Sequence, residues 1–441
     1  MRAFETEKTE VAEIDRSVYD IKDKVNAAFE VNSGLTAEIV EQISKEKHDP
    51  DWMREFRLKA LDIYNKASLP NWGPSLEGLD MRNIVTYVRP NTEMRGKWSE
   101  VPDDIKNTFE RLGIPQAERS SLAGVGAQYD SEVVYHNVKE EVAAQGVVYT
   151  DFDTALDQYE DIVKAHFMKL VPPTDHKFAA LHGAVWSGGS FVYVPAGVDV
   201  SIPLQSYFRL NAPGAGQFEH TMIIVEKGAK VHFIEGCSAP KYNVANLHAG
   251  CVELFIGDDA ELTYSTIENW SKNMYNLNTK RAIVGKNGRI NWVTGSFGSH
   301  TSCLYPMSIL NGEGAHCEFT GVTFAGAGQF LDTGSKVVHN APNTTSNINS
   351  KSLSKSGGVS IYRGSVLPTI SCESLMLDEE SQSDTIPAII VKNDNIDLGH
   401  EASIGRISDE AIFYLMSRGL SEDDARAMLV RGFVEPVSKA L

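Results

Sequence analysis

The chain has 441 residues, with 41 basic and 59 acidic side chains, and a formal net charge of −18. This length exceeds what one ordinary hydrophobic core supports, so the sequence predicts two or three structural units. The acidic composition argues against a nucleic-acid partner, because phosphate binding needs clustered Lys and Arg. No run of about eighteen apolar residues exists, so no membrane span is expected.

The N-terminal sequence and the cysteine content both bear on the cellular compartment. The first fifteen residues are acidic and contain no apolar segment of the kind found in secretory signals. Five cysteines, an odd number spread over a long chain, indicate a reducing environment rather than a disulfide framework. The sequence therefore predicts a cytoplasmic protein.

Charge is distributed unevenly along the chain. Residues 1–170 carry 21 basic and 32 acidic side chains, and residues 371–441 carry 6 and 14. The middle block, residues 171–370, carries only 14 basic and 13 acidic side chains but holds 23 of the 35 glycines. Low charge, many glycines and β-branched or aromatic runs favour a large β structure between two acidic, helical flanks.

The N-terminal flank contains three predicted helices. The first begins after Thr36, whose hydroxyl is a typical N-cap acceptor. The second spans residues 51–66, where apolar residues recur at helical spacing. The third covers about residues 154–170 and should end before Pro172 and Pro173.

The middle block contains a repeat of nearly constant period. Its turn positions are Gly228, Asp259, Asn287 and Gly314, so that successive turns are thirty-one, twenty-eight and twenty-seven positions apart. Three positions after each turn stand Val231, Leu262, Ile290 and Cys317. Five positions after each turn stand the aromatic residues Phe233, Tyr264, Trp292 and Phe319. The two-residue alternation predicts strands with one buried face, stacked at a fixed period.

This repeat favours a mainly β fold, a right-handed parallel β-helix flanked by helical N-terminal and C-terminal regions. A β-sandwich built of hairpins is the alternative, because periodicity alone does not fix strand direction. The predicted units are a helical and loop-rich region over residues 1–170, a β-helix over 171–405 and a helical hairpin over 406–441. In that hairpin, the first helix begins after Ser408 and ends at Gly419. The second begins after Ser421 and should stop at Gly432.

Several common catalytic motifs are absent from the sequence. There is no GxxxxGK[ST] phosphate loop, no GxSxG elbow and no HExxH zinc motif. The five cysteines form no CxxC pair, which excludes a zinc or ferredoxin-type site built from one local motif. Any nucleotide hydrolysis linked to this protein should therefore reside in a partner.

The cysteines differ in their sequence surroundings. Cys317 occupies the aliphatic position of the repeat and is expected in the core, as are Cys251 and Cys303. Cys237 lies in the segment 235–240, EGCSAP, where the alternation ends in a Gly/Pro turn. A reachable thiol and a buried one are both consistent with that position.

Cys372 is the other candidate functional cysteine. His400 and Glu401 follow it by twenty-eight and twenty-nine positions, a separation that matches the repeat period. Residues one coil apart stack about 4.8 Å from each other in a β-helix, so these three side chains could converge. Thiolate, imidazole and carboxylate together suit iron or an iron–sulfur cluster with mixed ligands. The alternative is a buried Cys, a surface His and a solvated Glu.

A different class of protein must also be considered. A β-helix with paired carboxylates on a groove would suit a carbohydrate-active enzyme. The best candidates for such a pair are Glu253, Asp258 and Asp259, all at or beside turns. Acidic residues are common in turns, so this signal is weak.

Three stretches resemble a known family. They are residues 371–433, beginning SCESLMLDEESQSD, residues 235–240, EGCSAP, and residues 269–288, NWSKNMYNLNTKRAIVGKNG. They resemble the SufB/SufD family, the scaffold subunits of the SUF iron–sulfur cluster assembly system, over about residues 70–435. The NMYNLNTKRA segment and Cys372 favour the SufB branch over the SufD branch.

The resemblance implies a fold and a set of partners. The fold would be a right-handed parallel β-helix whose C-terminal hairpin docks the ABC-type ATPase SufC. The partner across the β-helix edge would be SufD or a second copy of this chain. Sulfur would come from the cysteine desulfurase SufS through a SufE- or SufU-type carrier. The cargo would be a transient iron–sulfur cluster, and reduced FAD accompanies some complexes of this kind.

The resemblance also implies site residues. Cys237 matches the proposed sulfur acceptor, as a nucleophilic thiolate of low pKa, and Cys372 matches the cysteine at the cluster-building interface. His400 and Glu401 match neighbouring ligands. The residues that match a proposed sulfur path through the β-helix are Arg209, Asn211, Thr266, Glu268, Trp270 and Lys286.

Two positions depart from the family pattern. This chain has no Cys before Cys237, whereas some members carry an N-terminal cysteine cluster. Gly399 stands where some members have an acidic residue before the His-Glu pair. The expected function is therefore a non-catalytic scaffold for cluster assembly. A SufD-like structural partner is the nearest alternative.

Overall fold

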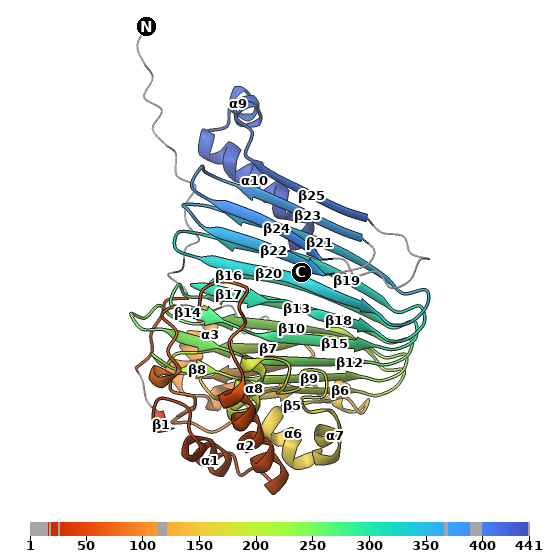
Figure 1. Ribbon diagram of the computed structural model, residues 1–441. Helices are drawn as coiled ribbons and strands as arrows, with labels where there is room; N and C mark the ends of the chain where they lie inside the picture. Colours follow the sequence, from red (N-terminus) through yellow and green to blue (C-terminus); the bar gives the residue numbers. More distant parts are fainter. Residues whose placement is uncertain are drawn as a thin grey trace.

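The computed structural model describes residues 16, 19–24, 27–112, 121–365, 369–388 and 399–439. Parallel strands stack into a β-solenoid of about seven turns, with helices at its N-terminal end and a helical hairpin at its C-terminal end (Figure 1). The protein is therefore mainly β, as the sequence predicts. The parallel pairing rules out the β-sandwich alternative, which required antiparallel hairpins.

The first wall of the solenoid is a ten-stranded sheet. It is parallel except at the β3–β4 pair. In spatial order its strands are β25 (Gly399–Arg406), β23 (Thr369–Met376), β21 (Thr345–Ser354), β19 (His316–Ala325), β16 (Arg289–Gly298), β13 (Glu261–Trp270), β10 (Lys230–Ser238), β7 (Asp199–Arg209), β3 (Gly124–Tyr129) and β4 (Glu132–Val138).

The second wall is built from shorter strands. Its path runs through β5 (Val148–Asp151), β6 (Gly189–Val194), β9 (His220–Val225), β12 (Cys251–Ile256), β15 (Thr279–Val284), β18 (Met307–Leu310), β20 (Phe330–His339), β17 (Thr301–Leu304), β14 (Met274–Asn276), β11 (Asn246–His248) and β8 (Gly216–Gln217). Two further strands extend the wall beyond β20, namely β22 (Val359–Ser365) and β24 (Gln382–Ala388).

The register of the strands confirms the sequence repeat. Val231 pairs with Leu262, which pairs with Ile290, and the aromatic position two residues later stays aligned in the same way. The aromatic rings stack along the interior, with centroids 5.8 Å apart for Phe233 and Tyr264. Because side chains alternate across a strand, this register sends both positions of every repeat into one continuous core.

The backbone conformation explains which residues occupy the turn position of the repeat. Gly228 and Gly314 have φ values of 69° and 72°, and Asp259 and Asn287 have values of 57° and 51°. This left-handed region is open to Gly and, among other residues, is most accessible to Asn and Asp. The choice of Gly, Asp, Asn and Gly at one position of four coils therefore follows from a single turn geometry.

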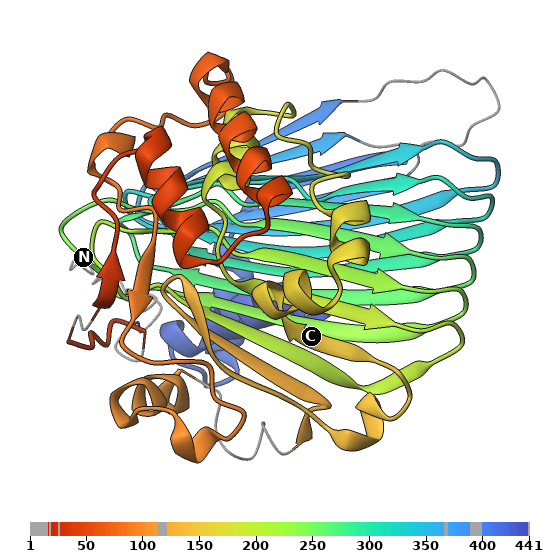
Figure 2. The ribbon, with the colours of Figure 1, turned by 90° about the horizontal axis from the view of Figure 1, so that it is seen from below.

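Helices surround the N-terminal end of the solenoid (Figure 2). A short antiparallel pair, β1 (Ala27–Glu30) and β2 (Val88–Pro90), lies among them. The helices are α1 (Ala37–Glu46), α2 (Asp51–Lys66), α3 (Asp103–Arg111), α5 (Glu140–Ala143), α6 (Phe152–Gln158), α7 (Glu160–His166) and α8 (Lys177–Val185), with single 3₁₀ turns at Met81–Asn83 and Trp98–Glu100.

Two of the three predicted N-terminal helices are confirmed, and the third is wrong in its extent. The Thr36 hydroxyl accepts the N–H of Ile39 at the start of α1, and α2 has the expected bounds. The segment over residues 154–170 is two short helices, α6 and α7, instead of one. Tyr159 leaves the helical conformation between them, and its ring stacks on Phe191 at 5.8 Å. Packing against the solenoid therefore overrides the helical periodicity.

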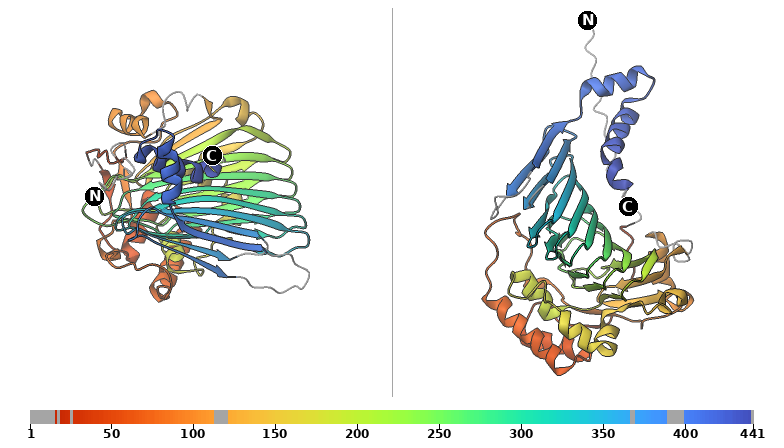
Figure 3. Two further views of the ribbon diagram at one scale, coloured as in Figure 1. Left: turned by 90° about the horizontal axis from the view of Figure 1, so that it is seen from above. Right: turned by 90° about the vertical axis from the view of Figure 1, so that its right-hand side faces the viewer.

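The C-terminal hairpin consists of α9 (Asp409–Ser417), which lies beyond the last coils, and α10 (Glu422–Ser438), which runs back beside the solenoid (Figure 3). The hydroxyl of Ser421 accepts the N–H of Asp424, and Gly419 has a φ of 99° after α9, as predicted. Gly432 does not stop α10, which continues to Ser438. The Nζ of Lys351 lies 4.6 Å from the Phe433 ring centroid, so contact with the solenoid supports the extra turns.

Within the residues that the structure describes, no helix combines the length and apolar character needed to cross a bilayer.

Candidate functional site

Cys237 lies inside the solenoid. It belongs to β10, which extends through Ser238, and only 1% of the residue is exposed. The Gly/Pro turn expected around Cys237 begins later, and of the two alternatives that the sequence left open the structure shows the buried thiol. The thiol faces the Glu235 carboxylate, with Sγ 4.0 Å from Oε1.

Charged side chains surround this thiol. The Nζ of Lys280 lies 3.1 Å from Glu235 Oε1, 3.1 Å from Glu268 Oε1 and 3.1 Å from the Thr266 hydroxyl. All four side chains are buried. Tyr264 donates its hydroxyl hydrogen to the other oxygen of Glu235. A buried charge requires a partner of opposite sign, and here one ammonium group serves two carboxylates.

The electrostatics of this cluster favour a protonated Cys237. Burial raises the pKa of the thiol well above its ordinary value, and the nearby Glu235 and Glu268 carboxylates raise it further. Burial alone would lower the pKa of Lys280, but the same two carboxylates outweigh burial and raise it. The low-pKa thiolate expected from the sequence is therefore wrong for this closed arrangement, because Lys280 is already neutralised by two carboxylates.

Two inward-facing columns of residues run from this cluster along the first wall. In-register pairing defines one column as Glu235, Thr266, Thr294, Gly321, Ser350 and Cys372. The neighbouring column is Cys237, Glu268, Ser296, Thr323, Ser352 and Ser374. The interior is apolar at the aromatic positions of the repeat but polar along these two columns. The polar columns connect the two cysteines singled out from the sequence.

A cavity lies between these columns and the opposite wall. Its lining begins at Thr266, Glu268 and Lys280, beside the Cys237 cluster, and reaches Ser350, the in-register neighbour of Cys372. Hydroxyl groups supply most of the polar lining between these ends. Its first-wall lining comes from β13, β16, β19 and β21, and its volume of about 30 Å³ has room for about one water molecule.

Cys372 occupies the far end of this path, on β23. It is 4% exposed, and burial raises the pKa of its thiol to about 12. In β25 its in-register neighbour is Ala402, whereas His400 pairs with Ile370. The prediction that His400 stacks directly on Cys372 is therefore wrong by two positions, because the coil that joins these strands is slightly longer than the one that the prediction assumed.

Glu401 and His400 lie on β25, the outermost described strand of the first wall. Glu401 pairs with Ser371 and is exposed, so strand alternation places it on the face opposite to Cys372. The side chain of His400 lies outside the described part of the structure. Within one chain, Cys372 and Glu401 do not converge on one point.

Arg209 and Asn211 hold an N-terminal segment over the Cys237 end of the solenoid. The Arg209 guanidinium donates to the carbonyl oxygens of Tyr19, at 2.9 Å, and Ile21, at 2.6 Å, and to the Ser238 hydroxyl. The Asn211 side-chain oxygen accepts the N–H of Asp23. These two residues therefore fix the backbone of residues 19–24 beside Ser238, on the face of the strand opposite to Cys237.

Lys286 is not part of the site. It is exposed in a turn, where its backbone N–H donates to Asp258. Lys280 occupies the place in the site that was predicted for Lys286. The sequence contained a signal for Lys280, because alternation in the strand TKRAIV puts it on the same face as Ala282 and Val284. A lysine at an inward position requires an acidic partner, which identifies it as a site residue.

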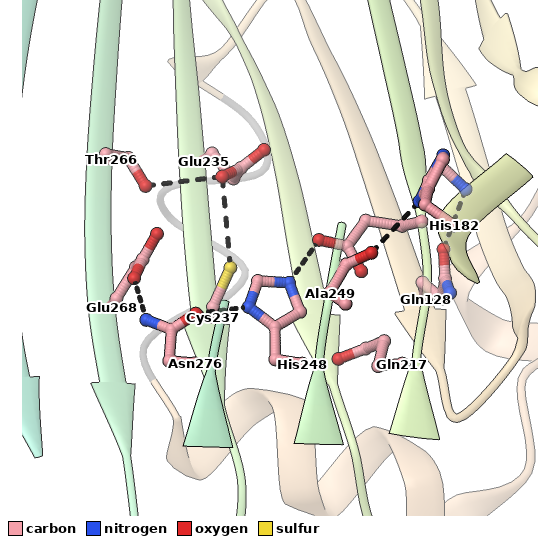
Figure 4. Close-up of polar contacts among 12 residues, drawn as sticks. Gln128, His182, Gln217, Glu235, Cys237, His248, Ala249, Thr266, Glu268 and Asn276 are labelled. Carbon is pink, nitrogen blue, oxygen red and sulfur yellow. Dashed lines mark hydrogen bonds and ion pairs between the residues drawn. The ribbon is translucent and has the colours of Figure 1, made fainter. Parts of the chain in front are cut away.

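A chain of polar residues that includes His248 and Asn276 continues the cluster on its other side (Figure 4). Trp270 is fully buried, and its ring centroid lies 4.6 Å from that of His248. The His248 ring bonds to Glu219 on one side and to Asn276, at 2.7 Å, on the other. Asn276 donates to Glu268. No sequence pattern selects His248, Glu219 and Asn276, which meet only through the stacking of coils.

Glu253 is not available as a catalytic carboxylate of a carbohydrate-active enzyme. It is completely buried and accepts three backbone N–H groups, and burial raises its pKa to about 7. The other two candidates, Asp258 and Asp259, are exposed neighbours in a turn, where they accept hydrogen bonds from Lys286 and Asn287. The three cysteines outside the path also lie where the sequence predicts core residues, since Cys317 and Cys251 are 1% exposed and Cys303 is partly buried.

Comparison with known proteins agrees with this architecture. The family model described as "SUF system FeS cluster assembly, SufBD core domain" matches residues 208–433, and "SufBD protein N-terminal region" matches residues 38–206. The chain is 49% identical over 432 residues to "Iron-sulfur cluster assembly protein SufB" of Bacillus subtilis, covering 96% of this chain and 93% of the relative. SufBD family proteins of Staphylococcus haemolyticus and Staphylococcus aureus match with the same identity and coverage. This chain therefore belongs to the SufB/SufD family of the SUF iron–sulfur cluster assembly system.

Proposed function

We propose that this chain is a non-catalytic scaffold that accepts persulfide sulfur at Cys237 and builds an iron–sulfur cluster at Cys372. The observation that carries the proposal is the polar interior that joins these two thiols. Five strand-to-strand steps separate β10 from β23, about 24 Å at the usual spacing of neighbouring strands. The two thiols therefore cannot exchange sulfur by direct contact, and the polar columns are the part of the interior that joins them.

Sulfur acceptance requires Cys237 to lose a proton. The Glu235 carboxylate is the nearest acceptor, and the ammonium group of Lys280 lies beside it to stabilise the resulting negative charge. The Cys237 thiolate then attacks the outer sulfur of a carrier persulfide. The sulfur–sulfur bond of the carrier breaks, the carrier leaves as a thiolate, and Cys237 holds the persulfide. The carrier is a SufE- or SufU-type protein charged by the desulfurase SufS.

Cluster building takes place beside β25, where the described part of the first wall ends. A second β-helix, either SufD or a second copy of this chain, pairs along this edge and supplies further ligands. In that arrangement Glu401 could act as a cluster ligand at the interface, because its exposed side chain would face the partner. His400 lies on the same strand. The iron–sulfur cluster is cargo, and no residue of this chain is assigned to reduced FAD.

The energy for opening this interface comes from a partner. SufC, an ABC-type ATPase, binds the α9–α10 hairpin, and its nucleotide-driven dimerisation shifts the equilibrium between closed and open scaffolds. The hairpin presents the apolar surface that such binding needs, with Phe413 74% exposed and Tyr414 57% exposed. The cytoplasm is the compartment that suits five free thiols.

The test is anaerobic purification of the full-length chain with its co-expressed partners, followed by assay of iron and acid-labile sulfide. Cys372→Ala should abolish cluster formation and leave the complex assembled. Cys317→Ala is the matched control, because Cys317 is an inward-facing cysteine of the same wall that lies outside both polar columns. Normal cluster content in Cys372→Ala would contradict the proposal and favour a SufD-like structural role.

A further inference from the structure

A second group of ligating side chains lies at the N-terminal end of the solenoid, outside the Cys237–Cys372 path. It joins His182 of α8, His220 of β9 and Cys251 of β12. One ligand atom from each lies within 4.8 Å of the others, and none of the three residues is more than 1% exposed. Cys251 and His220 are in-register neighbours on adjacent parallel strands, so both point to the same face.

Hydrogen bonds fix the orientation of His182. Its Nδ1 lies 3.0 Å from the carbonyl oxygen of Ala249, which can only accept, so Nδ1 carries the hydrogen. The lone pair of Nε2 is then directed at His220 Nδ1, 3.0 Å away. An imidazole that donates one N–H to a backbone carbonyl and presents the other nitrogen inward is the usual arrangement of a metal-binding histidine.

One ring nitrogen of His220, Nε2, is buried without a hydrogen-bond partner among the described residues. To bond to the His182 lone pair, His220 Nδ1 must carry a hydrogen. A neutral His220 then turns a bare Nε2 toward Glu253 Oε2 at 3.3 Å, and no hydrogen bond forms at this buried nitrogen among the described residues. Only a proton from Glu253 would satisfy it. A cation on Nδ1 would instead place the hydrogen on Nε2, where Glu253 accepts it.

We propose that His182 Nε2, His220 Nδ1 and Cys251 Sγ bind a resident divalent transition-metal ion of the Zn²⁺ type, with a water molecule as its fourth ligand. Two imidazole nitrogens on one tetrahedral Zn²⁺ lie about 3.3 Å apart, since each bond is about 2.05 Å long. The observed separation of 3.0 Å needs to widen by only a few tenths of an ångström. Two imidazoles and one thiolate form a donor set suited to Zn²⁺ and excluded for Mg²⁺ or Ca²⁺.

The surroundings of the three ligands agree with a bound cation. A thiolate leaves one positive charge on the ion, and the Glu253 carboxylate balances it through His220. Three backbone N–H groups, from Met168, Leu170 and Val171, hold that carboxylate in place. Aromatic rings pack against the His220 ring, with the centroids of Phe167 and Phe152 at 4.5 and 4.7 Å. Such a shell fixes the ligands and slows exchange of the ion.

Because the site is buried, the ion must be loaded while the chain folds. The full-length chain is therefore produced in a minimal medium that contains Co²⁺ in place of Zn²⁺, and the purified protein is assayed for cobalt. We expect one Co²⁺ per chain, the d–d bands of a tetrahedral ion and a thiolate-to-cobalt charge-transfer band. Cys251→Ser should remove the charge-transfer band, and His220→Asn should remove the bound ion.

Two controls separate this site from the other thiols. Cys317→Ser, at another buried cysteine, and Cys372→Ala, at the proposed cluster site, should both keep the full spectrum and one Co²⁺ per chain. If Cys251→Ser or His220→Asn does not fold, X-ray absorption of the zinc-loaded wild type decides by showing two N and one S ligand. A folded wild-type chain without stoichiometric Co²⁺ or Zn²⁺, or a band that survives in Cys251→Ser, would overturn the proposal.

Discussion

The ammonium group of Lys280 lies 3.1 Å from the carboxylate of Glu235, and both side chains are sealed inside the solenoid. The two residues come from opposite walls, β15 and β10, and are 45 positions apart in sequence. Their contact places a positive charge next to the proton acceptor of Cys237. It also makes the stability of the fold depend on the charges of the proposed sulfur-accepting site.

The first prediction concerns this pair. Lys280→Met should lower the free energy of unfolding by about 3–5 kcal/mol, because it leaves two buried carboxylates without their cation. Lys286→Met, six residues away in an exposed turn, should change it by less than about 0.5 kcal/mol. Urea unfolding of both variants measures the difference. Equal stability of the two variants would show that Lys280 does not carry the charge balance of the cluster.

The second prediction concerns the pH dependence of stability through Asp130. Its carboxylate accepts the N–H groups of Asn211 and Ala212, yet burial raises its pKa from 3.8 to about 6. Folding is therefore accompanied by protonation of Asp130 when the pH lies between 3.8 and about 6. The stability from this group is complete below pH 3.8 and is lost as the pH rises through about 6. The loss amounts to about 3 kcal/mol, at about 1.4 kcal/mol per pKa unit.

Asp130→Asn tests this dependence, because Asn keeps the acceptor oxygen and cannot ionise. Relative to the wild type, the variant should gain about 3 kcal/mol of stability between pH 4 and pH 7. Urea unfolding at several pH values measures the gain, and Asp62→Asn, at an exposed helix position, is the control. Parallel pH profiles for the wild type and Asp130→Asn would contradict the assignment.

The third prediction concerns the N-terminal segment over residues 19–24. Asp23 anchors this segment, since its carboxylate accepts the hydroxyl hydrogens of Thr108 and Tyr129 and its N–H donates to Asn211. Asp23→Ala should lower the free energy of unfolding by about 1–2 kcal/mol, because it leaves the two hydroxyl groups without their acceptor. Urea unfolding measures the change, and Asp62→Asn, at an exposed helix position, is the control. A stability equal to that of the wild type would show that Asp23 does not anchor the segment.

The fourth prediction concerns the C-terminal hairpin. Phe413 and Met428 are exposed on α9 and α10, so Phe413→Ser with Met428→Ser should leave the free energy of unfolding within about 0.5 kcal/mol of the wild type. Binding of a SufC-type ATPase should weaken at least tenfold, because apolar anchors dominate such interfaces. Calorimetric titration measures the affinity. Unchanged affinity would place the ATPase elsewhere on the chain.

Much of the fold could be predicted because the repeat is a local property of the sequence. Val231 and Phe233 alternate with outward residues in the same way as Ile290 and Trp292, and a strand with one buried face demands that alternation. The turns at Asp259 and Asn287 could also be identified locally, because their backbone needs a left-handed residue. Tyr159 shows where local reasoning failed, since its contact with Phe191 breaks a helix that the periodicity extends.

The stacked β architecture, the terminal hairpin and the choice of Cys237 and Cys372 as candidate thiols can all be read from the amino-acid sequence. The contacts that those thiols make cannot, although Thr266 and Glu268 are named from the sequence and both lie beside Lys280. Lys280, not Lys286, meets Glu235, and Ala402, not His400, pairs with Cys372, because the length of each coil sets the register between strands. Coil lengths vary by a few residues, and a shift of one or two positions changes every neighbour across the ladder. The chemistry of this interior therefore depends on register, which is visible only in the folded solenoid.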